Sequence, residues 1–335
     1  MIQGKPWTNQ EEDIVTEWWA FGLEGLGVEN SFESLQTFLT DQGFNRSIEA
    51  IKRKIRRLDI QKHSSSIPIS EKKVVETRHT SWLTGDIPLV KGNITKFVML
   101  NDIHVPHNID LTNIFHFIQD FKPDYVLLVG DIVNNDPFDH WKKAKPGTFK
   151  GMPQPKSYYE LCNKEFYRPL RKICSNECKI IHWIGNHEYW SNRAIEEMPE
   201  GEGYWEVENN IEGIDFWVPN KQIANLGKLH FIHGDIFQGK NHSQKALNYY
   251  RRNLLYGHFH NYEVSSYTSP IDVEDRHTAK CVGTLEKFNP DFMENRPHQW
   301  IQMFSYGVVY SDGSFSDQQA IITNNRFYAA GKIYG

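Results

Sequence analysis

The sequence is short of the features that mark secreted, membrane-spanning and strongly basic proteins. Its 335 residues include four cysteines, which show no metal-binding or disulfide framework. No apolar run approaches the ~20 residues of a membrane span, and the N-terminus does not read as a signal peptide. The formal net charge is −5, so a nucleic-acid surface would have to be local. These absences predict a cytoplasmic protein with reduced thiols and no membrane partner.

The first 62 residues predict a small all-α domain of three helices. Thr8 and Glu11 form a capping box for the first helix, and a second helix is expected over residues 32–41. Ser47 is a favourable N-cap for the third helix, whose apolar residues recur at helical spacing on one face. Basic residues occupy the rest of this helix and the position before it: Arg46, Lys52, Arg53, Arg56 and Arg57.

These three helices, with tryptophans in the first and basic residues in the third, resemble the Myb/SANT helix-turn-helix family. In that family the third helix enters the major groove and contacts phosphates and base edges. The resemblance therefore implies that DNA is a partner and that the five basic residues bind it. Two other interpretations stay open, a SANT-type protein-binding module and a merely solvated basic face.

Residues 63–93 lose periodicity and are interpreted as a linker, with one strand expected at residues 73–75. From residue 94 to the C-terminus, strand and helix patterns alternate, which predicts a layered α/β domain. Buried strands are expected at 96–100, 125–129, 180–184, 228–232 and 253–256. Helices are expected at 111–121 and 158–173, and a hairpin around 300–310.

Each of the five predicted strands ends in residue types that bind metals. The five strand ends are Asp102-x-His104, Gly130-Asp131, Gly185-Asn186-His187-Glu188, His233-Gly234 and Gly257-His258-x-His260. Period-2 alternation would place Asp102 and His104 on one face, and likewise His258 and His260. Imidazole and carboxylate together suit Mn, Fe or Zn, and a carboxylate can bridge two ions. One such pair could be an ordinary core histidine, but five in the same structural position predict a metal centre.

The five blocks, in this order, resemble the calcineurin-like metallophosphoesterases. The resemblance implies a β-sandwich flanked by helices and two divalent metal ions, with Mn as the first choice and Fe, Zn, Ni or Mg as alternatives. One ion would take Asp102, His104, Asp131 and His260. The other would take Asp131, Asn186, His233 and His258, so that Asp131 is shared.

The same resemblance implies metal-dependent phosphoester hydrolysis without a covalent enzyme intermediate. His187 would stand beside the metals and stabilise the phosphorane charge or protonate the leaving oxygen. Glu188 is expected to support the centre, and its presence after Asn-His resembles the phosphatases. Arg193 is a candidate phosphate contact, with a solvated helix arginine as the alternative.

The substrate is argued from what accompanies these blocks. The arginine that Ser/Thr phosphatases carry after the second block is missing from Gly130-Asp131-Ile-Val-Asn134-Asn135. Basic and aromatic residues interleave between 137 and 156, which suits single-stranded nucleic acid, although an ordinary solvated loop is the alternative. With the helical unit, they favour a DNA endonuclease or nickase, or else an exonuclease. The other readings are a phosphatase or small-molecule phosphodiesterase, and a DNA-binding scaffold with a vestigial metal site. Such a two-part chain looks like those of bacteriophages, which would act in the host cytoplasm.

Overall fold

A computed structural model describes most of the second half of the chain and parts of the first. The described residues are 15, 35–36, 39–40, 44, 46–57, 81–90, 92, 94–139, 155–288, 290, 293 and 296–335, with backbone alone at 53, 55–57 and 200. The chain divides into two compact units, residues 1–75 and 76–335, each considered by itself. The domain limits expected at residues 62 and 94 stay predictions.

In the first unit, helix α3 (Ile48–Arg57) begins where the N-cap predicts. The Ala50 backbone N–H lies 3.3 Å from the Ser47 hydroxyl, which accepts its hydrogen bond. Ile51, on the apolar face of α3, is fully buried, as are Val15, Leu35 and Leu39. These last three residues are helical. The remainder of the expected first and second helices lies outside the described residues, so the three-helix domain stays a prediction.

The second unit contains two six-stranded sheets. In the first sheet the strand order is β12-β11-β2-β3-β4-β5. Four strands run parallel: β2 (Ile94–Leu100), β3 (Tyr125–Val129), β4 (Lys179–Trp183) and β5 (Phe216–Val218). The hairpin of β11 (Met303–Tyr310) and β12 (Phe315–Ile321) adds antiparallel to β2.

In the second sheet the order is β1-β6-β7-β8-β10-β9. Its strands are β1 (Gly85–Ile87), β6 (Ala224–Leu226), β7 (Leu229–Ile232), β8 (Asn253–Tyr256), β9 (Tyr262–Thr268) and β10 (Arg276–Val282). Within it, β7, β8 and β10 run parallel to one another. A separate hairpin of β13 (Phe327–Ala329) and β14 (Lys332–Tyr334) closes the chain.

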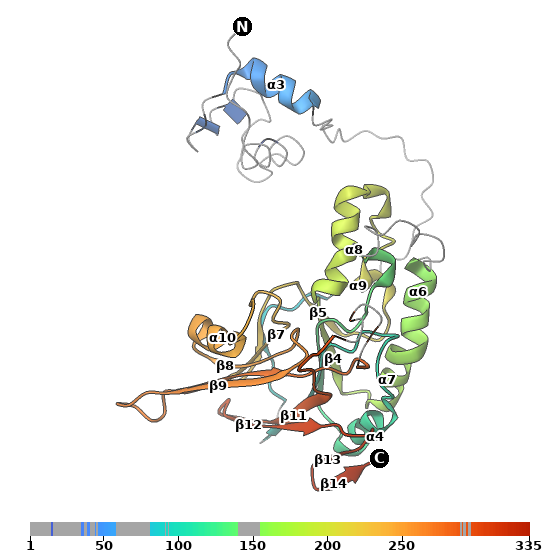
Figure 1. Cartoon of the computed structure of the whole chain (residues 1–335), viewed down its shortest axis with the longest axis vertical. Helices are drawn as coiled ribbons and strands as arrows, with labels where there is room; N and C mark the ends of the chain where they lie inside the picture. The colour runs from blue at the N-terminus through green and yellow to red at the C-terminus, as the bar shows by residue number, and fades with distance from the viewer. Residues whose placement is uncertain are drawn as a thin grey trace. The chain divides into compact units, whose positions relative to one another are not determined.

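The two sheets pack face to face and helices cover their outer faces. Because side chains alternate along a strand, Phe97 and Met99 of β2 enter the core between the sheets, whereas Val98 and Leu100 enter the core under the helices. A third core lies between the second sheet and α10 (His242–Tyr250). In Figure 1, α10 lies on one side of the strands, and α4, α6 and α7 lie on the other.

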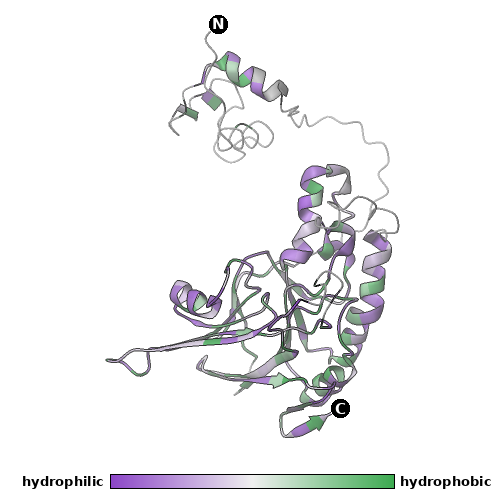
Figure 2. Cartoon of the chain, in the orientation of Figure 1, coloured by the Kyte–Doolittle hydropathy of each residue, from purple (hydrophilic) through white to green (hydrophobic). Residues whose placement is uncertain are grey.

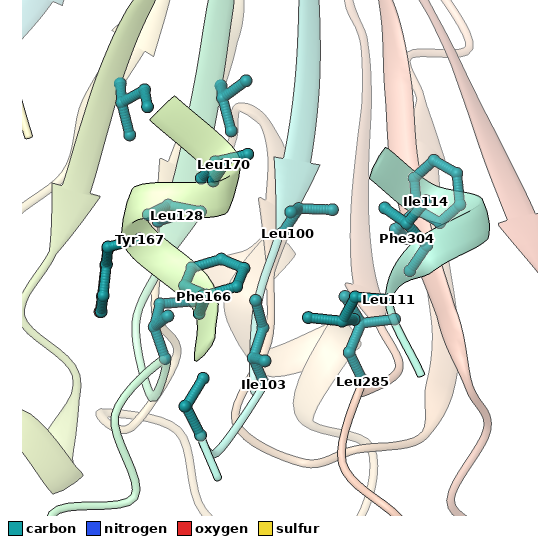
Figure 3. Close-up of a cluster of buried hydrophobic side chains, with 14 of the residues drawn as sticks. Leu100, Ile103, Leu111, Ile114, Leu128, Phe166, Tyr167, Leu170, Leu285 and Phe304 are labelled. Atoms are coloured by element: carbon teal, nitrogen blue, oxygen red, sulfur yellow. The ribbon is translucent and has the colours of Figure 1, made fainter. Parts of the chain in front are cut away.

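The helices over the first sheet are α4 (Thr112–Phe121) and a longer segment made of α6 (Pro155–Cys162), a π-helical turn η2 (Asn163–Tyr167) and α7 (Arg168–Ile173). Figure 2 shows apolar and polar residues alternating along this longer segment, as an amphipathic helix requires. Figure 3 shows Phe166, Tyr167 and Leu170 of this segment beside Leu100 and Leu128 of the sheet. Other helical elements of the second unit are η1 (Asp136–Phe138), α8 (Asn186–Glu197), η3 (Pro199–Gly201) and α9 (Val207–Asn210).

This architecture confirms the predicted α/β class and the helix-flanked sandwich. The expected strands β2, β3, β4, β7 and β8, the two helical segments and the late hairpin are all present. Within the segment interpreted as a linker, residues 85–87 form β1 in the second sheet. Ile87 is buried in the core between the sheets, with Leu83 and Leu89 packed against it. The strand expected at 73–75 lies outside the described residues. Over the part of the chain that is described, no helix combines the length and apolar character needed to cross a membrane.

Candidate metal centre

The predicted metal ligands follow the carboxyl ends of five strands drawn from both sheets. Strands β2, β3 and β4 of the first sheet run parallel, as do β7 and β8 of the second, so the ends of each set fall at a common edge. Polar side chains collect at such carboxyl edges in α/β folds. Face-to-face packing of the sheets then brings the two sets of strand ends together.

Five of these ligands have a left-handed backbone. Positive φ occurs at Asp102 (48°), His104 (53°), Asp131 (50°), His258 (73°) and His260 (60°). The expectation that strand alternation aligns Asp102 with His104 is therefore wrong, because these residues lie beyond the strands in tight loops. A non-glycine residue in this region is strained by about 1–2 kcal/mol. Strain of this kind gathers at functional sites, where the surrounding structure imposes it.

The first ligand cluster consists of Asp102, His104 and His260. The Nε2 atoms of His104 and His260 are 3.2 Å apart, and Oδ1 of Asp102 lies 3.2 Å from His260 Nε2 and 4.0 Å from His104 Nε2. The other oxygen, Asp102 Oδ2, accepts hydrogen bonds from the His258 N–H and the Asn101 amide. Oδ1 is buried without a hydrogen-bond partner among the described residues.

The second cluster consists of Asp131, His233 and His258. His233 Nε2 lies 3.1 Å from Asp131 Oδ2 and 3.1 Å from the side-chain oxygen of Asn186. Asp131 also belongs to a third group, with His104 and His187, in which the ligand atoms lie within 4.8 Å of one another. Asp131 thus lies between the two clusters, in the place the shared ligand was expected to occupy.

The hydrogen bonds of the imidazoles test whether these residues fit a cation. His233 Nδ1 faces the Val129 carbonyl oxygen at 3.1 Å and must therefore carry the proton. In the neutral ring, Nε2 then directs a lone pair at the oxygens of Asp131 and Asn186, which are also acceptors. His104 is arranged alike, because its Nδ1 faces the Asn134 side-chain oxygen at 2.9 Å. Within each cluster, several lone pairs therefore point toward one another. A cation bound between them would accept these lone pairs and remove their mutual repulsion.

The spacing of the ligand atoms also fits. Divalent ions bind nitrogen and oxygen at ~2.1 Å, which places neighbouring ligand atoms ~3 Å apart. The 3.1 and 3.2 Å separations in the two clusters agree with that value. Burial pulls the pKa of His233 down, but the Asp131 carboxylate outweighs it and raises the pKa to about 10. The site attracts a positive charge, as a metal centre does.

Glycines before the ligands are required by close approach. A Cβ on Gly185 would lie 2.3 Å from Oδ1 of Asp131, and one on Gly257 would lie 2.1 Å from Oδ2 of Asp102. Any other residue at these positions would displace a carboxylate of the metal centre. Gly185 and Gly257 therefore have a packing role in addition to any role in forming a turn.

Glu188 supports the centre by binding backbone N–H groups of the loops that carry the ligands. It is fully buried, and its two oxygens accept hydrogen bonds from four backbone N–H groups, at residues 131, 132, 133 and 185. Three of these donors belong to the loop that carries Asp131. Burial and the charge of Asp131 raise the pKa of Glu188 to about 8.

His187 lies beside the ligand clusters, half-buried, with its ring packed against that of Trp190 at 3.9 Å between centroids and tilted by 31°. Its backbone N–H donates to Asp131 Oδ1, and its Nδ1 lies 2.9 Å from the Asn134 carbonyl oxygen. Nε2 is 3.9 Å from Asp131 Oδ2, so it faces the centre. Asn134 therefore orients two histidines, His187 through its carbonyl oxygen and His104 through its side chain. Sequence reasoning noted Asn134 only as part of a motif that lacks an arginine.

Six basic residues complete the predicted contacts, and of these only Arg193 belongs to the second compact unit. Arg193 is exposed on α8 and its guanidinium lies 5.6 Å from the ring centroid of Tyr189. Arg46, Lys52, Arg53, Arg56 and Arg57 belong to the first compact unit, and the side chains of the last three lie outside the described residues. The basic residues at 142–150 also lie outside that part of the chain.

Comparison with known proteins decides the family. The calcineurin-like phosphoesterase profile matches residues 95–300, more than half of the chain. The chain belongs to the calcineurin-like phosphoesterase family. The match covers all five ligand-bearing strand ends and makes this protein a metallophosphoesterase-type phosphoester hydrolase. No curated protein matches the chain.

Solved structures similar to this calcineurin-like phosphoesterase are distant in sequence. Zn-complexed Vps29 from Entamoeba histolytica has 12% identity and a TM-score of 0.37, covering 70% of this chain and 96% of its own. Vps29 from Chaetomium thermophilum has 12% identity and a TM-score of 0.32, covering 68% and 98%. A dimetal phosphatase from Danio rerio has 10% identity and a TM-score of 0.32, covering 69% and 96%.

Proposed function

We propose that this phosphoesterase is a dinuclear, Mn-dependent DNA endonuclease or nickase that its N-terminal helical unit directs to DNA. The observation that carries the hydrolytic part is the pair of ligand clusters that meet at Asp131. Asp102, His104 and His260 would hold one ion, and Asn186, His233 and His258 the other. When bound, two divalent ions supply positive charge to phosphate oxygens and lower the pKa of a water molecule.

The chain's own groups complete the site. His187 keeps its proton on Nδ1, bound to the Asn134 carbonyl oxygen, so Nε2 faces the centre. From that position, a protonated Nε2 would stabilise charge on the phosphoryl group or pass a proton to the departing oxygen. Glu188 holds the Asp131 loop through three backbone hydrogen bonds and ties it to Gly185 through a fourth, which keeps the shared carboxylate in place as charge develops.

Aromatic rings beside the centre support a substrate that carries bases. The rings of Trp190 and His187 pack against each other at a tilt, and Trp300 packs edge-on against His260 with 4.4 Å between centroids. Both tryptophans are partly exposed. A base next to the scissile phosphate can stack on such rings, a contact worth ~1–3 kcal/mol that tolerates any sequence. A phosphoserine side chain has no ring to use this surface.

Helix α3 supports DNA as the partner. Six basic residues lie on or next to it, Lys54 and the five candidate contacts, while Ile51 on its apolar face is buried. A helix with one buried and one basic face can enter a major groove. Neutralising phosphates in this way would make binding strongly dependent on salt.

The test of the chemistry is a substrate screen with full-length protein and Mn²⁺. We expect nicking of supercoiled plasmid and cleavage of labelled oligonucleotides. His187→Ala should lower cleavage by about 10²–10⁴-fold while metal stays bound. His116→Ala is the matched control, because His116 is exposed on α4 and the substitution should leave cleavage unchanged. Hydrolysis confined to phosphopeptides or p-nitrophenyl phosphate, with no DNA product under any metal, would refute the nuclease and leave a phosphatase.

The test of targeting is the salt dependence of DNA binding. Reversing one charge on the helix, Lys52→Glu, should weaken binding and reduce the slope of log K against log salt by about 1–2. Lys172→Glu is the control, since Lys172 is an exposed residue of α7. Equal effects of the two substitutions would show that α3 does not bind DNA.

A further inference from the structure

A buried glutamate that no sequence block contains lies against the first ligand cluster. Glu286 follows β10 in the chain, and its segment is tied to the backbone of Asp102. The Leu285 N–H and the Thr284 hydroxyl both donate to the Asp102 carbonyl oxygen, at 3.0 and 2.8 Å. The Glu286 N–H donates to the Thr284 hydroxyl oxygen. The position of Glu286 is thus coupled directly to that of a predicted metal ligand.

The side chain of Glu286 is 1% exposed, and neither of its oxygens has a hydrogen-bond partner among the described residues. Its Oε2 lies 3.6 Å from His260 Nδ1 and 4.0 Å from His104 Nε2. Leaving a buried carboxylate without a partner is strongly unfavourable, so such groups are paired or bind metals. Glu188, by contrast, accepts four backbone hydrogen bonds. Glu286 therefore lacks the contacts of a structural carboxylate and is placed instead beside the site of a cation.

His260 explains how Glu286 can act. Its Nε2 points into the cluster, 3.2 Å from both Asp102 Oδ1 and His104 Nε2. Its Nδ1, on the opposite side of the ring, is buried without a hydrogen-bond partner among the described residues and faces Glu286. A carboxylate behind a metal-binding histidine fixes the proton on the far nitrogen and makes the near nitrogen a stronger ligand.

We propose that Glu286 is a positioning residue of the metal site built from Asp102, His104 and His260, acting through the Nδ1–H of His260. A small rotation of either side chain brings the 3.6 Å separation to hydrogen-bond length. This inference rests on the metal centre of the proposed function and is independent of the DNA substrate. It also makes the two sites unequal, because one gains a second carboxylate while the other relies on the neutral amide of Asn186.

The experiment measures metal binding rather than activity. Metal-free full-length protein is titrated with Mn²⁺, and free Mn²⁺ is followed by electron paramagnetic resonance. In wild type we expect two ions. In Glu286→Gln one ion should bind 10–100-fold more weakly, while the other keeps its affinity within about threefold. Glu286→Asp keeps the charge and should recover part of the loss.

Glu208→Gln is the matched control. Glu208 also has a buried oxygen without a hydrogen-bond partner among the described residues, but it belongs to none of the ligand clusters. This control should bind both ions as wild type does. Two unchanged affinities in Glu286→Gln, or equal weakening of both ions, would overturn the inference. A wild-type protein that binds no ion would instead refute the metal centre itself, so the two failures are distinguishable.

Discussion

Two buried glutamates beside the same metal centre should respond in opposite directions to the same isosteric change. Glu188 accepts four backbone N–H groups at 2.7–2.9 Å, whereas Glu286 accepts none among the described residues. Glutamine offers one carbonyl oxygen, so in Glu188→Gln two of the four donors would face an amide NH₂ instead. Each buried donor without an acceptor costs about 1–3 kcal/mol. We therefore expect Glu188→Gln to lower the free energy of unfolding by about 2–6 kcal/mol.

Glu286→Gln is the internal control, because the Glu286 oxygens accept no hydrogen bond from a described residue at their observed distances, so the change removes no backbone acceptor. Its free energy of unfolding should equal or exceed that of wild type. The assay is urea unfolding of metal-free protein at about pH 5. Because burial and Asp131 raise the pKa of Glu188 to about 8, its ionisation lowers wild-type stability at higher pH and would offset the loss of hydrogen bonds there. Two results would contradict the role assigned to the four hydrogen bonds. One is a free energy of unfolding for Glu188→Gln within about 0.5 kcal/mol of the wild-type value, and the other is an equal loss in Glu188→Gln and Glu286→Gln.

Three further outcomes follow from the same contacts. Asn134→Leu removes the side-chain oxygen that orients His104, and it should lower Mn²⁺ affinity or the rate of plasmid nicking about 10–100-fold. Asn134→Asp keeps an acceptor at this position and should have a smaller effect. Burial raises the pKa of Glu208 from 4.5 to about 6, so its contribution to stability is complete below about pH 4.5 and lost above about pH 6. In urea unfolding, Glu208→Gln should therefore be more stable than wild type by about 1 kcal/mol at pH 8 and no more stable at pH 4. Removing the metal with a chelator should abolish hydrolysis and lower the melting temperature. Adding Mn²⁺ back at 100 times its Kd should raise the free energy of unfolding by ~2.7 kcal/mol for each ion bound.

Much of the phosphoesterase unit could be predicted because its signals are local. Continuous apolar runs such as 125–129 and 253–256 become buried strands with the expected limits. A strand buried on both faces needs apolar residues at nearly every position, and few other secondary-structure elements have this requirement. The ligands could be found for a related reason, since histidines and carboxylates directly after buried strands have no role in a core.

Other features left no local signal. Asn134 and Glu286 lie 30 and 182 positions along the chain from His104, and nothing in their spacing marks them as its neighbours. Strand β1 comes from a polar stretch with only Ile87 buried, so its pairing with β6 depends on a partner far away in sequence. The alignment of Asp102 with His104 was expected from strand alternation, but left-handed backbone in the loops produces it.

The sequence by itself determined the reaction type, because the residues that bind metals must follow the strands that hold them. The signals were hydrophobic runs and the polar residues that follow them, and these residues are adjacent in the sequence. Only the tertiary structure decided how the centre is held: which carboxylate is bonded to the backbone, which accepts no hydrogen bond from the described residues, and which nitrogen of each histidine faces inward. Those properties depend on hydrogen bonds between segments that are distant in the chain. The bonds of Glu188 exist only after the strands of the first sheet have paired, and the contacts of His233 and His260 only after the two sheets have packed together.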